Sequence, residues 1–86
     1  MIPLEDELRA ALLDLAHQRG TAKSFCPSEV ARALTTEWRP LMAPIRRVAS
    51  DLIREGQLIA TQKGRPVDPE QAKGPIRLAL RPSHCS

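Results

Sequence analysis

The sequence has 86 residues. Among its ionisable side chains, arginine and lysine are the most numerous, with 13 against 10 aspartates and glutamates. Residues 39–54 predict a helix with an apolar arc on one side, and the opposite side collects four arginines and a serine: Arg39, Arg46, Arg47, Ser50 and Arg54. Arg39 shares this side only if the helix extends back past Pro44. The guanidinium fork fits phosphate oxygens and guanine edges, so the pattern is typical of a helix that contacts nucleic acid.

A second group of cations follows in the segment 63–73, where Lys63, Arg65 and Lys73 stand against Asp68 and Glu70. Lysine and arginine at the tip of a loop can bind the phosphate backbone and make affinity depend on salt. Asp68 precedes Pro69 and is suited to cap a short helical turn. Three interpretations remain open: the loop contacts nucleic acid, it fixes its own fold, or it binds a protein.

A plainer interpretation of the helix competes with nucleic-acid binding. An exposed helix face is usually charged, and these arginines could pair with Asp51, Glu55 or Glu29. Helices that read bases also tend to carry Asn, Gln, Ser or Thr, and here only Ser50 is present. If nucleic acid is bound, the composition therefore favours phosphate contact over sequence reading.

Catalytic and metal-binding patterns are not found in the sequence. Cys26 precedes a helix, where a thiol can be activated, but His17 and His84 are not placed to act as its base. We assign Cys26 a structural role. Neither a phosphate-binding glycine loop nor zinc-ligand spacing occurs. We therefore expect no enzyme activity, no catalytic residues, no metal, no cofactor and no small-molecule substrate.

Length and composition indicate a single small domain spanning residues 1–86, with a core at about 3–80 and a frayed tail at 81–86. The net charge of +3 is unevenly distributed, because residues 1–16 sum to −3 and residues 39–86 to +5. Phe25 and Trp38 are the two aromatic residues, which argues against binding single strands by stacked rings. Without a signal peptide, an apolar membrane span or a disulfide framework, we expect a cytoplasmic protein.

The elements that must position these residues follow from hydrophobic spacing and from capping signals. Residues 3–18 predict a first helix, closed by Gly20 in the left-handed C′ position. Phe25 is expected to make a short strand pairing. A second helix is predicted over 27–34, with Cys26 at its N-cap and Glu29 completing a capping box.

The third helix has two open starts: near Pro40 with a kink, or at Pro44 after a short turn at 39–42. Gly56 is expected at its C′ position. Residues 58–62 and 76–80 alternate as strands. The segment 64–75 between them holds two glycines and three of the prolines, so we predict a long loop that cannot continue a ladder, with one helical turn at 69–72.

This order predicts an α+β fold, a winged helix-turn-helix with three helices followed by a β-hairpin wing. The runs Cys26-Pro27-Ser28-Glu29-Val30-Ala31-Arg32-Ala33-Leu34, Trp38-Arg39-Pro40-Leu41-Met42, Thr61-Gln62-Lys63-Gly64-Arg65-Pro66-Val67-Asp68-Pro69 and Lys73-Gly74-Pro75-Ile76-Arg77-Leu78 also carry a resemblance. Over residues 5–80 the chain resembles a family of small bacterial proteins, a domain of unknown function assigned to the winged-helix class. The resemblance implies this fold and a bacterial cytoplasmic origin, and it implies no activity.

Our leading hypothesis is that the protein binds double-stranded DNA, as transcription regulators of this fold do. The residues expected to make the contact are those of the third helix and the wing: Arg39, Arg46, Arg47, Ser50, Arg54, Lys63, Arg65 and Lys73. The alternative is a protein-interaction module that uses the same surface to bind a partner protein or a second copy of the chain, without nucleic acid.

Overall fold

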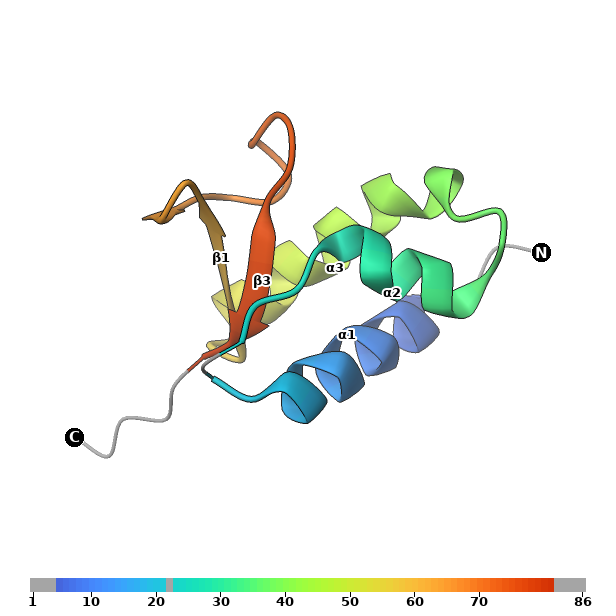
Figure 1. Ribbon diagram of the computed structural model, residues 1–86, viewed down its shortest axis with the longest axis horizontal. Helices are drawn as coiled ribbons and strands as arrows, with labels where there is room; N and C mark the ends of the chain where they lie inside the picture. Colours follow the sequence, from blue (N-terminus) through green and yellow to red (C-terminus); the bar gives the residue numbers. More distant parts are fainter. Residues whose placement is uncertain (1–4, 22, 82–86) are drawn as a thin grey trace.

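The computed structural model describes residues 5–21 and 23–81. Three helices precede a three-stranded antiparallel sheet (Figure 1). The elements in chain order are α1 (Glu5–Arg19), α2 (Pro27–Leu34), the 3₁₀ turn η1 (Arg39–Leu41), α3 (Met42–Arg54), β1 (Leu58–Gln62), β2 (Arg65–Pro66) and β3 (Arg77–Leu80). The α+β layout agrees with the prediction and is compatible with a winged helix.

The end of α1 and the start of α2 show the predicted capping. Gly20 has φ +75° and donates its N–H to the Ala16 carbonyl at 2.9 Å, so it closes α1 in the left-handed conformation. Pro27 is the first residue of α2, and the Glu29 carboxylate accepts the Cys26 N–H at 2.8 Å. The predicted start of the first helix at residues 3 and 4 lies outside the described residues.

The start of α3 lies between the two positions that the sequence left open, Pro40 and Pro44. The short turn η1 comes first, as one alternative requires, but α3 then begins at Met42 and not at Pro44. Pro44 is the third residue of α3, where a backbone N–H has no partner within the helix, so its missing donor costs nothing. Gly56, with φ +81°, follows the helix as predicted.

The sheet has the strand order β2-β1-β3, with β1 in the middle. Leu58 pairs with Leu80 and Thr61 with Arg77, which sets the register between β1 and β3. Phe25 forms an isolated antiparallel bridge with Leu78, and both of its hydrogen bonds measure 2.7 Å. The predicted pairing of Phe25 is therefore confirmed, and it ties the connector before α2 to the last strand.

The prediction for residues 64–75 was wrong at its start and correct further along. Lys63 (φ 53°) and Gly64 (φ 81°) form a two-residue turn with both residues left-handed, the geometry that suits a tight hairpin. The ladder therefore continues into Arg65 and Pro66, which pair with Gln62 and Thr61. An edge strand of two residues tolerates proline because only one side of it must bond.

The β2–β3 loop, residues 67–76, contains the predicted helical turn. The Asp68 carbonyl accepts the N–H groups of Gln71 at 3.1 Å and Ala72 at 2.8 Å. The Asp68 carboxylate accepts the Glu70 N–H at 2.9 Å, which confirms Asp68 as the cap of this turn.

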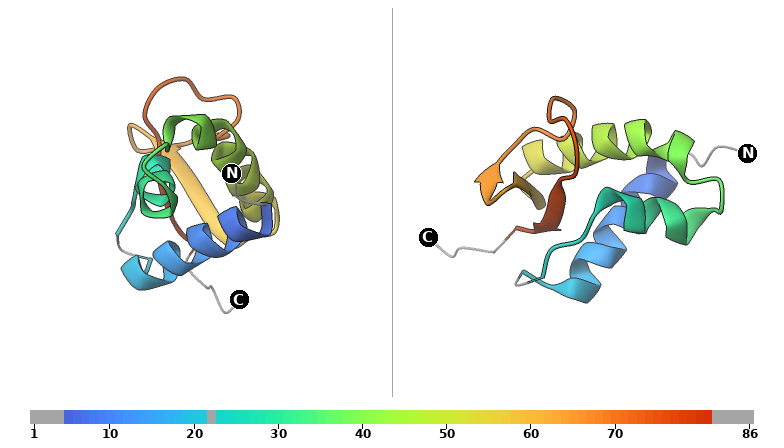
Figure 2. Two further views of the ribbon diagram at one scale, coloured as in Figure 1. Left: turned by 90° about the vertical axis from the view of Figure 1, so that its right-hand side faces the viewer. Right: turned by 45° about the horizontal axis from the view of Figure 1, so that its top comes forward.

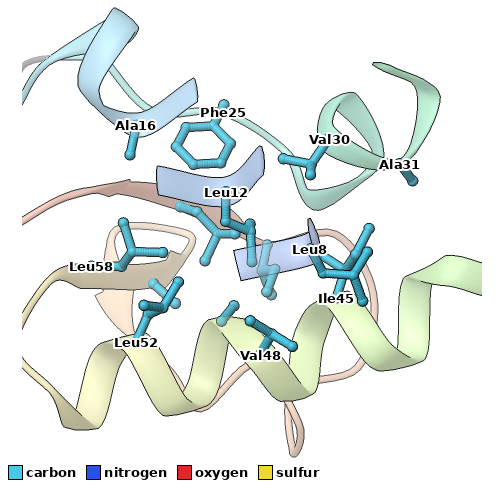
Figure 3. Close-up of a cluster of buried hydrophobic side chains, with 14 of the residues drawn as sticks. Leu8, Leu12, Ala16, Phe25, Val30, Ala31, Ile45, Val48, Leu52 and Leu58 are labelled. Carbon is cyan, nitrogen blue, oxygen red and sulfur yellow. The ribbon is translucent and has the colours of Figure 1, made fainter. Parts of the chain in front are cut away.

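The core lies between the three helices and the sheet. Seen from one end, α2 and α3 stand on either side of an interior that α1 closes (Figure 2). Phe25 and Leu12 are fully buried among side chains from all three helices (Figure 3). In the described part of the chain, no helix combines the length and hydropathy needed to cross a bilayer.

The left-handed turn gives a stability prediction. A Cβ added at Gly64 would meet no neighbouring atom within 4 Å, so the cost of Gly64→Ala comes from its positive φ alone, about 1–2 kcal/mol. We expect Gly64→Ala to lower the free energy of unfolding in urea by that amount. Lys63→Asn should leave it unchanged or raise it, because asparagine tolerates this conformation. Equal values for Gly64→Ala and the parent protein would contradict the turn assignment.

Candidate nucleic-acid interface

The tip of the β1–β2 hairpin and the end of the β2–β3 loop bring three predicted cations together. We call Lys63, Arg65 and Lys73 the hairpin patch. All three are exposed, and they line one hollow of about 780 Å³ together with Gln62, Pro66, Val67 and Pro75. None of the three makes an ion pair with any residue that the structure describes.

Lys73 follows Lys63 by ten positions in the sequence. It lies beside the hairpin because Gln62 holds its backbone there. The Gln62 side-chain amide donates to the carbonyls of Lys73 at 2.6 Å and of Pro75 at 3.1 Å. One side chain of β1 thereby holds both ends of the turn that presents Lys73. The hairpin patch is thus a product of the tertiary structure as well as of the sequence.

Arg46 has a different environment from the hairpin patch. Its guanidinium donates to three backbone carbonyls of the β2–β3 loop: Ala72 at 2.8 Å, Gly74 at 2.7 Å and Pro69 at 3.3 Å. The side chain is half-buried beneath the loop. Its donors therefore hold the loop against α3.

Ser50 lies one turn further along α3 and supports the same contact. Only 4% of Ser50 is exposed, and its hydroxyl donates to the Asp68 carboxylate at 3.3 Å. Pro69, the next residue of the loop, is fully buried. At this depth Ser50 cannot reach a ligand outside the protein while the loop stays in place.

Arg54 and Arg47 remain exposed, but both have acidic neighbours. Arg54 lies 2.7 Å from Asp51 and 3.7 Å from Glu70, so two carboxylates offset its charge. Arg47 lies 3.3 Å from Glu5 of α1, with more than half of each side chain exposed. Such exposed pairs are weak, so Arg47 can leave Glu5 for another anion at little cost.

The last predicted residue, Arg39, lies on an aromatic ring. Its guanidinium carbon is 5.0 Å from the centre of the Trp38 ring, and that of Arg32 from α2 is 4.7 Å from the same centre. We call Arg32, Trp38 and Arg39 the tryptophan patch. Both arginines are exposed and neither pairs with a described carboxylate, so cation–π attraction orders two charges that stay available.

Arg32 and Arg77 were missed at the sequence level. Arg32 belongs to the exposed side of a predicted helix, and a tryptophan six residues later was the signal that could have identified it. Arg77 gave no signal, because its partners come from a distant segment. It donates to the Ser24 hydroxyl, the Ser24 carbonyl and the Cys26 sulfur, each at 2.9 Å, and so fixes the connector before α2.

Two acidic side chains, Glu29 beside this connector and Glu55 after α3, also bind other residues of the protein. Glu29 accepts the Cys26 N–H and lies 2.7 Å from Arg19. The hydrogen bond from Cys26, with Arg19 in support, lowers the pKa of Glu29 below its ordinary value of 4.5. Arg9 of α1 binds Glu55 after α3 and lowers the pKa of that carboxyl in the same way.

The predicted residues therefore fall into two groups. The structure brings Lys63, Arg65 and Lys73 together, and it places Arg39 at the far end of α3 on Trp38. It commits Arg46 and Ser50 to the β2–β3 loop and surrounds Arg54 with acids. Free positive charge lies on the hairpin and the tryptophan patches more than on the middle of α3.

A family model described as a protein of unknown function (DUF3253) matches residues 5–81. No curated protein matches the chain. The matched range contains every cation discussed above.

The position of Glu29 gives a pH prediction. Because its pKa is lower in the folded protein than in the unfolded chain, its carboxylate stabilises the fold above about pH 4.5, and this contribution is lost as the pH falls through the folded-state pKa. We expect Glu29→Gln, which keeps an acceptor for the Cys26 N–H but no charge, to lose less stability than the parent between pH 6 and pH 3. Urea unfolding at each pH measures this.

Glu37→Gln, which removes an exposed carboxyl outside the helices with no ion pair among the described residues, is the matched control for the loss of one negative charge. Superimposable curves for Glu29→Gln and the parent protein would show that the Glu29 charge contributes nothing to folding.

Proposed function

Because this chain belongs to the DUF3253 family, whose description assigns no function, we propose a function from its charged surface: the protein binds double-stranded DNA through contacts to phosphates. The observation that carries the proposal is the hairpin patch. Three exposed cations surround one hollow, and no described acid pairs with any of them.

Like charges gathered in this way attract a polyanion. Each Lys or Arg that neutralises a phosphate releases condensed counterions, which supplies most of the affinity for DNA of any sequence. Lys63 lies in the left-handed turn, Arg65 directly follows it, and Gln62 holds the backbone of Lys73 beside them. Their charges are thus held near one another before any ligand arrives, so little backbone ordering opposes binding.

The position of the hairpin supports the same proposal. The β1–β2 hairpin projects at one end of the molecule, away from α2 and η1 (Figure 1). A projecting hairpin can approach a duplex closely, because the helices do not collide with the DNA. Lysine and arginine on such a hairpin can bind the phosphate oxygens of the backbone.

The tryptophan patch adds two cations at the other end of α3. A helix of 13 residues is roughly 20 Å long, less than the 34 Å of one turn of B-DNA. The two patches lie beyond opposite ends of α3 in a molecule whose longest extent is 43 Å, so a duplex of about one to two turns is long enough to contact both. We include Arg32 and Arg39, with the exposed Arg47, as secondary contacts.

A salt titration with a matched charge control tests the proposal. We expect the parent protein to bind a random-sequence duplex at 50 mM salt and to lose affinity steeply by 200 mM. The double variant Lys63→Gln/Arg65→Gln removes two phosphate contacts, so the slope of log K against log salt should become shallower by about 2. Fluorescence anisotropy with a labelled duplex measures both quantities.

Lys23→Gln/Arg81→Gln removes one lysine and one arginine from exposed positions away from the hairpin, so the net charge falls equally. Its slope should stay close to that of the parent. If the salt slope fell equally in the two double variants, net charge, and not the hairpin patch, would be what attracts the duplex. A parent protein that shows no salt-sensitive binding would overturn the proposal.

The alternative, a protein-interaction module, makes a different set of predictions. A second copy of the chain would give a particle of twice the 9.5 kDa monomer mass in light scattering. Capture of a partner protein together with failure to bind the duplex would favour this alternative.

A further inference from the structure

The outward side of α3, which would have to enter a DNA groove to read bases, is already occupied by the protein's own β2–β3 loop. Three carbonyls of that loop accept hydrogen bonds from Arg46, two of them at 2.7 and 2.8 Å. Arg46 lies at the middle of this side. Three of its five N–H donors, which elsewhere could bind guanine, are already used by these carbonyls.

The contact between loop and helix is also packed. Pro69 is fully buried, and the hydrophobic core is continued by Val67 and Ala72 of the same loop. The Ser50 hydroxyl lies beneath it on Asp68. Lifting the loop would expose this apolar surface and leave the Arg46 donors and the loop carbonyls to be resolvated, so the covered state is the stable one.

The remaining polar side chains on this side of α3 do not replace the base contacts that Arg46 and Ser50 cannot make. Arg54 is offset by Asp51 and Glu70, and the Glu70 carboxylate would repel phosphate at the same place. Arg47 is also exposed, over 58% of its side chain, and its single acidic partner is the equally exposed Glu5.

The width of α3 with its covering loop, compared with that of the major groove, also argues against base contacts by this helix. An α-helix with its side chains is about 10–12 Å across, and the major groove is about 12 Å wide, so a bare helix just fits. A helix that carries a loop over its outward side is wider than the groove. The side chains of α3 then stop short of the base edges, while cations at the hairpin still reach the backbone.

We infer that the DNA contact proposed above is made to phosphates alone, so that duplexes of any base sequence are bound alike. Arg46 is then a positioning residue, which holds the β2–β3 loop on α3 and does not touch the ligand. This inference rests on the proposed function and narrows its ligand to the sugar-phosphate backbone of a duplex, with the bases unread.

The first experiment uses the full chain and duplexes of equal length. Dissociation constants are measured for A·T-rich, G·C-rich and mixed duplexes at one salt concentration, and a randomised duplex pool is put through rounds of selection. We expect all duplexes to lie within about tenfold of one another and the selected pool to show no motif. Specific binding typically exceeds non-specific binding by roughly a thousandfold or more, so the two outcomes separate clearly.

Variants of Arg46 test its assigned role separately. Arg46→Gln removes a charge that touches no phosphate in this inference, so the salt slope should stay that of the parent, whereas a phosphate contact would lower it by about 1. Arg46→Lys keeps the charge but cannot serve three carbonyls with a rigid fork. It should speed hydrogen exchange at Gln71 and Ala72 while affinity for the duplex stays within about twofold.

A selected motif, or one duplex bound more than tenfold above the others, would overturn this inference and leave DNA binding intact. A drop in the salt slope of Arg46→Gln would do the same. Absence of binding to every duplex would overturn the proposed function and this inference together. If Arg46→Gln does not fold, the selection on the parent protein and the exchange rates of Arg46→Lys decide.

Discussion

One contact, from Arg46 to the β2–β3 loop, determines which side of α3 is covered. The Arg46 guanidinium bonds three carbonyls of this loop, which has only a single helical turn of its own. A planar fork with several N–H donors can bind carbonyls that face it from different residues, which a lysine cannot. With the loop fixed, Pro69 is buried and the Ser50 hydroxyl is covered. A separate side chain, Gln62, holds the backbone of Lys73 beside the hairpin.

The arginines of α3 and η1 show that charge in a sequence and charge available to a ligand are separate properties. Arg46 donates to backbone carbonyls, Arg54 lies near two carboxylates, Arg47 meets one exposed acid, and Arg39 stacks on Trp38. All four carry the same guanidinium group, so the neighbours alone make the difference. The positive surface that remains is displaced from the middle of the helix to its two ends, and this displacement underlies both proposals made above.

Much of the fold could be predicted because its signals are local. Gly20 and Gly56 end helices at the predicted positions, Glu29 caps α2, and strand β1 has the predicted bounds. The tight turn at Lys63 and Gly64 was missed because prolines nearby argued against a ladder, although a two-residue edge strand tolerates them. Of the candidate site, the hairpin cations were predicted individually, and the roles of Arg46 and Ser50 were not, because their partners lie 18 or more residues away.

The sequence by itself determined the order of the elements, the apolar side of each helix, the capping of the turn by Asp68, and the excess of positive charge in the second half of the chain. Those properties depend on residue type and on neighbours within a few positions, where backbone geometry fixes the distances. Only the tertiary structure decided which cations remain free. That outcome depends on how the β2–β3 loop folds back over α3, and hydrogen bonds between distant segments form only when burial of Pro69 and its neighbours brings those segments together.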